Sequence, residues 1–332
     1  MFKLNCKKLS HPFVVACMLM TTACDASTTE FQDKAAIKGF IQEMVKEHKF
    51  QSAELETIFA QAKRRQSILD AISRPAEAKP WYEYRPIFIT DSRIEGGIKF
   101  WNDNAITLKR ASEKFGVPAE IITAIIGVET RYGRHKGSFP LIDSLSTLAF
   151  AYPPRSRFFR SELKHFLLMT REEKMDPVSQ TGSYAGAMGM PQFISSSFRS
   201  YAIDFDGDGK KDLWNNADDA IGSVANYFKR HGWKEGDLIT HQVSTKGKKY
   251  KTYANQSLKP SLNVAELRKH GVLLNKTFNA TRMGALIELD KNEKEKEYWV
   301  GWDNFYVITR YNHSALYAMA VFQLAEQIKA KR

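Results

Sequence analysis

The sequence predicts an α+β protein that is mainly α-helical, with a small mixed α/β insertion near its C-terminal end. Between residues 33 and 237, apolar side chains recur every three or four positions, the spacing that buries one face of a helix. Residues 238–310 differ, because they are rich in Lys, Thr and Tyr and include the strand-like segments 285–289 and 298–309. The 332 residues are enough to bury a large core without disulfides.

The N-terminus has the features of an export signal. Three lysines among the first eight residues precede a short apolar run, 13–20, and small residues follow as far as Cys24. Eight apolar residues are too few to cross a bilayer, so residues 1–23 are predicted to be a signal peptide and residues 24–32 a polar tether. The residues before Cys24 also resemble a bacterial lipoprotein cleavage site, although Thr21 stands where Leu, Val or Ile is usual. Acylation of Cys24 therefore stays open.

Helical periodicity and breakers define the expected elements of the main region. Apolar positions predict a helix around 37–45, and Ser52 is expected to be the N-cap of the next one. A single long helix is expected from Asp91 to Phe115, where Gly116 ends it. Further helices are expected over residues 143–151, 157–170, 191–201, 217–231 and 313–330.

A buried helix in the middle of the chain carries the candidate catalytic residue. Residues 121–128 are apolar almost all round, and Glu129 lies at the C-terminal end of this helix. Burial and the negative end of the helix dipole both raise the pKa of a carboxyl group there. A Glu that keeps its proton can act as the general acid in glycosidic cleavage. The alternative is a structural Glu paired with Arg131 or Arg134.

The segment 182–193, GSYAGAMGMPQF, has very little side-chain bulk. Its glycines and alanines allow the backbone to approach a ligand or a neighbouring helix closely. Ser183 and Gln192 flank the small residues and offer hydrogen-bonding groups. Tight packing explains the glycines equally well but accounts less well for Gln192.

Residues 204–212 match the pattern of an EF-hand calcium loop. Carboxylates stand at loop positions 1, 3 and 5, and a backbone carbonyl is expected to contribute at position 7; the residues are Asp204, Asp206, Asp208 and Lys210. Carboxylates so close together repel one another unless a cation lies between them. Position 12 is Asn215 instead of Glu, so Asp218 or Asp219 is expected to close the site. A single loop without a paired partner predicts a structural ion.

Several other classes of protein are excluded or disfavoured. Cys24 is the only cysteine after the signal, and the sequence has no HExxH, CxxC, GxSxG, Walker or dinucleotide-binding motif. The formal net charge of +12 favours an acidic partner, and export favours an anionic polymer over nucleic acid. An ordinary glycosidase needs two carboxylates about 5–9.5 Å apart. No second acid stands out near Glu129.

Five segments together resemble the lytic murein transglycosylase B family, over about residues 33–328. They are GVETRYG, SYAGAMGMPQF, DFDGDGKKDLW, DAIGSVANYFKRHGW and TRYNHSALYAMAVFQL. The resemblance implies a lysozyme-like helical catalytic domain with Glu129 as its single catalytic residue and Asp219 as the closing calcium ligand. It implies substrate binding by Ser183, Gln192, Tyr227, Tyr311, Asn312 and Phe158. At Phe158, relatives often have a Tyr, whose hydroxyl hydrogen bond is absent here. Met190 and Pro191 also depart from the family pattern.

The implied reaction cleaves the MurNAc–GlcNAc bond of peptidoglycan without water and leaves a 1,6-anhydroMurNAc end. A lysozyme-type hydrolase and a non-catalytic wall-binding scaffold are the alternatives. The expected protein is a periplasmic monomer of a Gram-negative bacterium that binds glycan strands, a structural calcium ion and no organic cofactor. Its expected regions are a catalytic part, 33–237, an α/β insertion, 238–310, and a C-terminal helix, 311–332, that returns to the catalytic part.

Overall fold

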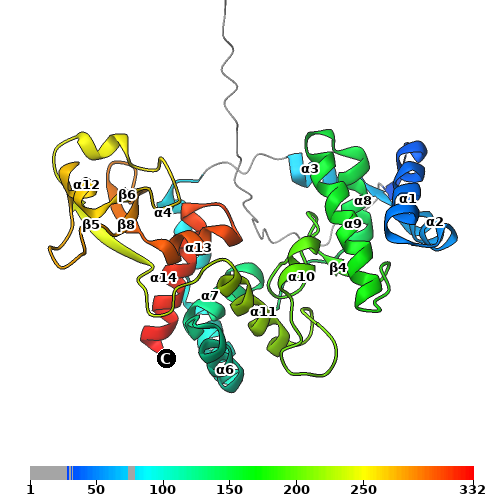
Figure 1. The fold of residues 1–332 in the computed structure, drawn as a ribbon, viewed down its shortest axis with the longest axis horizontal. Coiled ribbons are helices and arrows are strands. Elements are labelled where there is room, and N and C mark those ends of the chain that lie inside the picture. The colour runs from blue at the N-terminus through cyan, green and yellow to red at the C-terminus, as the bar shows by residue number, and fades with distance from the viewer. Residues whose placement is uncertain (1–27, 30, 32, 74–78) are drawn as a thin grey trace, which may run out of the picture.

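The computed structural model describes residues 28, 29, 31, 33–73 and 79–332 (Figure 1). The predicted signal peptide and Cys24 lie outside this range. In the part that is described, no helix combines the length and the apolar character needed to cross a bilayer. Helices make up most of the molecule and a five-stranded sheet lies at one side, which confirms the predicted mainly helical α+β class.

One helical lobe lies apart from the sheet, on the right of Figure 1. Its helices are α1 (Lys34–His48), α2 (Ser52–Gln61), α3 (Gln66–Ser73), α8 (Leu141–Ala151) and α9 (Ser156–Glu172). A short antiparallel ladder, β1 (Thr28–Thr29) with β2 (Arg64–Arg65), lies against α8. Phe40, Phe59 and Phe150 meet edge to face in its centre. Segments far apart in the sequence therefore share one core.

The central group of helices is built on α7 (Ala119–Thr130). Its other members are α4 (Trp81–Phe88), α5 (Asp91–Asp103), α6 (Ala105–Phe115), α10 (Ser195–Tyr201), α11 (Ala217–Arg230), α13 (Asp303–Tyr311) and α14 (Ala315–Lys331). Of these, α5, α6, α11 and α14 pack against α7. Every residue from Ile121 to Thr130 is buried, as the apolar sequence of α7 predicts. The last helix, α14, packs against α7, α5 and α4. The end of the chain thus completes the core around the candidate acid.

The insertion is an antiparallel sheet in the order β6-β8-β9-β5-β7. Its elements are β5 (Thr240–Thr245), β6 (Leu262–Asn263), α12 (Val264–Lys269), β7 (Val272–Leu273), β8 (Met283–Asp290) and β9 (Lys296–Gly301). Both faces of β8 are covered: Ala285 and Ile287 join the main core, whereas Leu286 joins a second cluster around Trp302. Burial on both faces explains why the strand is a continuous apolar run.

Two expected elements are wrong. The single helix over 91–115 is broken at Asn104, whose side-chain amide donates to the carbonyl of Phe100 at 2.8 Å, so α5 and α6 are separate. The strand-like segment 298–309 changes type, because β9 ends at Gly301 and α13 begins at Asp303. Short apolar runs do not distinguish a strand from a buried helix.

Two helix starts are shifted along the chain. α2 starts at Ser52 itself, after Gln51 as the N-cap. α10 starts at Ser195 instead of residue 191, because Pro191 and Gln192 belong to a turn in which Gln192 has a φ of 51°.

Candidate active site

Glu129 is a buried carboxyl group at the end of α7, with 5% of its surface exposed. The hydroxyl of Tyr317 on α14 donates to its Oε1 at 2.5 Å. Burial raises the pKa of Glu129 to about 7, and the hydrogen bond from Tyr317 opposes that rise. Burial is the larger of these two effects, so it favours an acid that holds its proton.

The turn after Glu129 is held by close packing. Arg131 and Tyr132 both have left-handed backbone conformations, with φ of 50° and 62°. The Tyr132 hydroxyl donates to the carbonyl of Arg93 at 2.7 Å, and the Arg93 guanidinium donates to the carbonyl of Gly127 at 2.5 Å. A Cβ at Gly127 would lie 2.6 Å from the Tyr132 ring, so only glycine fits there. These contacts fix the backbone that carries the acid.

Tyrosines from four other helices, α4, α11, α13 and α14, gather around Glu129. The ring of Tyr311 stacks on that of Tyr317 at 6.4 Å and is in turn 4.8 Å from Tyr227. Burial and the Glu129 charge raise the pKa of Tyr84, Tyr311 and Tyr317. Two of the predicted substrate residues, Tyr227 and Tyr311, therefore lie side by side, and their role in binding stays a prediction.

Two members of this group, Tyr84 and Tyr317, were missed in the sequence reading. Tyr84 lies in the aromatic segment 81–86, and Tyr317 in the C-terminal motif of the resemblance. Their spacing gave no reason to prefer them over neighbouring aromatic residues. The group of tyrosines around Glu129 therefore has two more members than the sequence analysis predicted.

The segment 182–193 forms a tight loop beside α7. It follows a short ladder between β3 (Phe139–Pro140) and β4 (Thr181–Gly182). A Cβ at Gly189 would lie 2.5 Å from the carbonyl oxygen of Leu213, so close backbone packing explains this glycine. The hydroxyl of Thr130 donates to the carbonyl of Met190 at 2.9 Å and joins the loop to the end of α7.

Polar side chains of this loop form part of their hydrogen bonds with the protein backbone. The Ser183 hydroxyl oxygen accepts the N–H of Ala187 at 3.0 Å, which leaves its own proton available. The Gln192 amide nitrogen donates to the carbonyls of Gly189 and Lys136, at 2.9 and 3.2 Å. The Tyr311 hydroxyl donates to the carbonyl of Pro191 at 2.6 Å. Gln192 and Tyr311 therefore shape the loop in addition to any contact with a ligand.

The two remaining predicted substrate residues differ in their surroundings. Asn312 follows Tyr311 and is 7% exposed, and its side-chain oxygen is buried without a hydrogen-bond partner in the described part of the chain. Such a group is costly unless a ligand or water satisfies it. Phe158 lies on α9, 5.1 Å from Phe159 and beneath the Arg155 guanidinium. The aromatic contacts of Phe158 among the described residues lie in the helical lobe that contains α9, away from the tyrosines around Glu129.

The predicted calcium loop places oxygen ligands around one point. Carboxylate oxygens of Asp204, Asp206 and Asp219 all lie within 4.8 Å of one another. Asp219 is fully buried at the start of α11 and accepts the N–H groups of Phe205 and Asp212, at 2.7 and 2.8 Å. Burial, together with the charges of Asp204 and Asp206, raises the pKa of Asp219. This set of hard oxygen donors fits a calcium ion.

The other two predicted calcium ligands, Asp208 and the Lys210 carbonyl, are not part of the group of three carboxylates. The Asp208 carboxylate accepts the N–H of Lys210 at 2.8 Å. Its role, like that of the Lys210 carbonyl, stays a prediction.

Replacing Tyr317 by Phe is expected to move the alkaline limb of the pH–rate profile upwards by about one pH unit. The hydrogen bond from Tyr317 lowers the pKa of Glu129, so its loss lets the acid keep its proton to higher pH. The measurement is kcat/KM on a soluble glycan fragment between pH 5 and 10. Tyr84→Phe is the matched control, since no hydrogen bond joins Tyr84 to Glu129 among the described residues. An unchanged or lower alkaline limb in Tyr317→Phe would contradict the assignment.

Comparison with known proteins identifies the family. A family model described as the transglycosylase SLT domain matches residues 32–326. The chain belongs to this family. Within the SLT family, membrane-bound lytic murein transglycosylase B of Escherichia coli (strain K12) is 42% identical to it, over 91% of the chain and 85% of the relative. The soluble lytic transglycosylase SltB1 from Pseudomonas aeruginosa is 51% identical, with a TM-score of 0.86 over 90% of this chain and 99% of that one.

Two further solved structures of similar proteins contain ligands. The lytic transglycosylase Slt35 of Escherichia coli, in complex with calcium, is 42% identical with a TM-score of 0.81, over 89% of this chain and 93% of that one. SltB3 from Pseudomonas aeruginosa, in complex with NAG-anhNAM-pentapeptide, is 29% identical with a TM-score of 0.79, over 89% and 79% of the two chains. These matches confirm the predicted lysozyme-like helical architecture and the predicted class, a peptidoglycan lytic transglycosylase.

Proposed function

We propose that this SLT-family transglycosylase cleaves the MurNAc-β-1,4-GlcNAc bond with Glu129 as its only catalytic carboxyl group. The observation that carries the proposal is the burial of Glu129 at the end of α7, beside the Tyr317 hydroxyl. Burial is the largest cause of the raised pKa of this carboxyl group, which is about 7, and the hydrogen bond from Tyr317 opposes the rise. A single acid at this pKa is suited to give up a proton and then take one back near neutral pH.

In the proposed reaction, the protonated carboxyl of Glu129 gives its proton to the glycosidic oxygen while the bond from C1 of MurNAc to that oxygen breaks. The carbonyl oxygen of the 2-acetamido group stabilises the positive charge at C1. The Glu129 carboxylate then removes the proton of the MurNAc 6-hydroxyl as O6 bonds to C1. The 1,6-anhydro ring closes without water, and Glu129 is protonated again for the next cycle.

The remaining predicted residues would hold the sugar rings. Tyr227 and Tyr311 offer aromatic faces next to the acid, and the unpartnered oxygen of Asn312 can accept a hydrogen bond from an N-acetyl N–H. The Ser183 hydroxyl can donate to the acetamido carbonyl. Gln192 would hold the 182–193 loop beside the acid. Phe158 would make only apolar contact, with a more distant part of the glycan chain.

Calcium is proposed as a structural ion of the 204–212 loop. Asp204, Asp206 and Asp219 would bind it, with Asp208 and the Lys210 carbonyl completing the set. When bound, it would neutralise the clustered carboxylates and tie the loop to the start of α11. It takes no part in bond cleavage.

The relatives support a place in the cell envelope of a Gram-negative bacterium. The Escherichia coli relative is named membrane-bound, which supports attachment to a membrane; we propose a periplasmic protein whose anchor to the outer membrane is an acylated Cys24. The partner is peptidoglycan, and the protein is proposed to act as a monomer. The intact mass of the mature protein would show whether Cys24 carries acyl chains.

Mass spectrometry of the soluble products of purified sacculi tests the reaction. Muropeptides that end in 1,6-anhydroMurNAc are expected. Reducing MurNAc ends without anhydro forms would establish a lysozyme-type hydrolase instead. Binding to sacculi without any release of products would establish a non-catalytic scaffold.

A further inference from the structure

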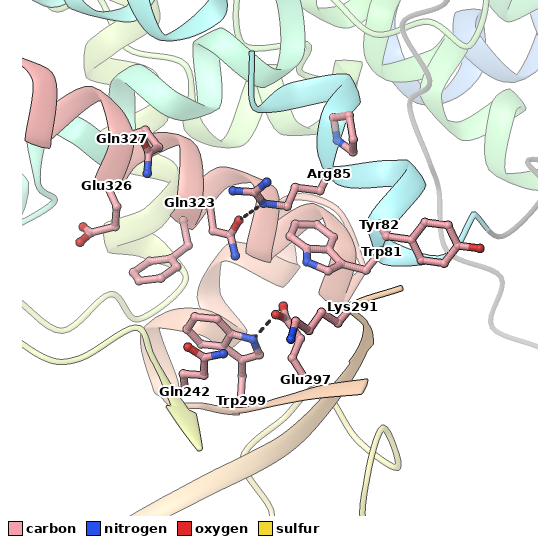
Figure 2. A pocket seen from close by; sticks show the side chains of 12 residues that line it. Trp81, Tyr82, Arg85, Gln242, Lys291, Glu297, Trp299, Gln323, Glu326 and Gln327 are labelled. Carbon is pink, nitrogen blue, oxygen red and sulfur yellow. Dashed lines mark hydrogen bonds between the residues drawn. The ribbon is translucent and has the colours of Figure 1, made fainter. Parts of the chain in front are cut away.

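A cavity lies beside α14, on the side of this helix opposite to Tyr317 and Glu129 (Figure 2). At about 100° per residue, the nine positions from Tyr317 to Glu326 place these two side chains on opposite faces of the helix. The cavity has a volume of about 640 Å³ between α4, α14 and the sheet strands β5 and β9. That volume falls in the range of small-ligand sites, about 300–1,000 Å³.

Aromatic side chains form the walls of this cavity. The half-buried indole of Trp299 on β9 packs edge-on against Phe322 at 6.4 Å, and its Nε1 donates to Glu297 at 3.1 Å. Trp81, at the start of α4, lies across the opening from it in Figure 2. Trp81 is only 2% exposed, so the half-buried rings of Trp299 and Phe322 are the ones that can offer faces to a ligand.

Neutral and oppositely charged polar groups surround those faces. The Arg85 Nε donates to the Gln323 side-chain oxygen at 2.6 Å, so the Gln323 amide nitrogen points elsewhere. The exposed Gln242 stands directly across the strand pair from Trp299. Lys291 also lines the cavity, and with Arg85 it is balanced by Glu297 and Glu326. The balance of charge disfavours a purely anionic ligand.

We propose that this cavity is a second saccharide-binding site that takes an N-acetylated amino sugar of a glycan strand. Flat aromatic faces suit the apolar face of a pyranose ring, and side-chain amides suit hydroxyl and N-acetyl groups, which both donate and accept. The choice of peptidoglycan as the source of the sugar rests on the proposed function. Because α14 separates this site from Glu129, a strand held here is not the segment being cleaved.

A second contact with the polymer has a defined consequence. It keeps the enzyme on the wall between cleavage events by raising the effective concentration of glycan at the catalytic cleft. A soluble fragment that fills only the cleft gains nothing from it. The site is therefore expected to affect insoluble sacculi selectively.

Trp299→Ala tests the proposal, with Trp101→Ala as the matched control, because Trp101 is a half-buried indole on α5 outside the cavity. In Glu129→Gln protein, Trp299→Ala is expected to weaken binding to sacculi about fivefold to tenfold. In otherwise wild-type protein, it should leave kcat/KM on a soluble tetrasaccharide within about twofold, as expected for a contact outside the cleft. The exposed Gln242→Ala, which removes no buried group, should weaken sacculus binding in the same direction.

The outcomes separate this proposal from the proposed function. If Trp299→Ala and Gln242→Ala bind sacculi as tightly as Trp101→Ala, the second site is overturned. The fluorescence that Trp299 contributes is the difference between wild-type protein and Trp299→Ala. If the free stem pentapeptide quenches this fluorescence and chitotetraose does not, the ligand is a peptide and the saccharide assignment is wrong. If wild-type protein forms no anhydro product from the tetrasaccharide, the proposed function fails, whatever the binding data show.

Discussion

Replacing Glu129 by Gln is expected to lower the rate of anhydro-product formation by about 10³-fold to 10⁴-fold. The loss is at the upper end of the range for a general acid or base, because one group serves as both. Gln has almost the same shape and can still accept the hydrogen bond from Tyr317. The measurement is the initial rate of anhydro-muropeptide release from sacculi.

A matched control separates loss of the acid from loss of a buried Glu. Glu162 on α9 is also 5% exposed, and it accepts the N–H of Ser196 at 2.9 Å. Glu162→Gln is expected to keep nearly full activity. A comparable loss in Glu162→Gln, or residual activity near wild type in Glu129→Gln, would contradict the role of Glu129.

The same Glu129→Gln variant should be more stable than wild type at pH 8. In the wild-type protein, the pKa of Glu129 is raised on folding from 4.5 to about 7. Between these two pH values the folded protein therefore binds a proton that the unfolded chain does not. Stability therefore decreases as the pH rises through this window, by on the order of 3 kcal/mol at most. Gln does not titrate, so the variant avoids that loss. Thermal unfolding at pH 4 and pH 8 measures the difference and shows that the inactive variant is folded.

Removing calcium is expected to lower the melting temperature by about 5–10 °C, and adding calcium should restore it. The physical reason is the repulsion among Asp204, Asp206 and Asp219, which a bound cation relieves. The measurement is a thermal melt in EDTA and then in increasing calcium. Magnesium should restore less, because it demands a smaller octahedral site.

Asp219→Asn tests the assignment of the closing ligand. Because Asp219 also accepts two backbone N–H groups, the variant is expected to be less stable even without calcium. The informative quantity is the increase in melting temperature on adding calcium, which should disappear. Asp103→Asn, on the surface of α5, should keep the full increase. A calcium response that survives in Asp219→Asn would exclude this residue as a ligand.

Local sequence patterns predicted the parts of the site that depend on neighbouring residues. The apolar run before Glu129 predicted its burial, and the aspartate spacing predicted the loop around Asp204. The spacing alone left Asp218 and Asp219 as alternatives, and only the family resemblance implied Asp219, because the choice depends on which carboxylate the start of α11 turns inwards. The fold shows that Asp219 is the buried one of the two.

Long-range contacts could not be predicted from the sequence. Tyr317 is 188 residues from the carboxyl group that it contacts, and no spacing rule links two such positions. The break at Asn104 depends on one side-chain hydrogen bond, which competes locally with a helix that the apolar pattern favours. The segment 303–311 has strand-like composition but lies in a helix, because packing of Phe305 and Ile308 in the main core outweighs a weak local preference.

The position of α14 also affects when the enzyme becomes active. Tyr317 lies on α14, and this helix also packs against α7, so the surroundings of Glu129 are complete only when α14 is in place. A proteolytically shortened chain that lacks this helix has an acid without its tyrosine partner and a core open to water. Water around the carboxyl would return its pKa towards that of an ordinary Glu. Incomplete copies are therefore expected to be harmless to the wall of the cell that makes them.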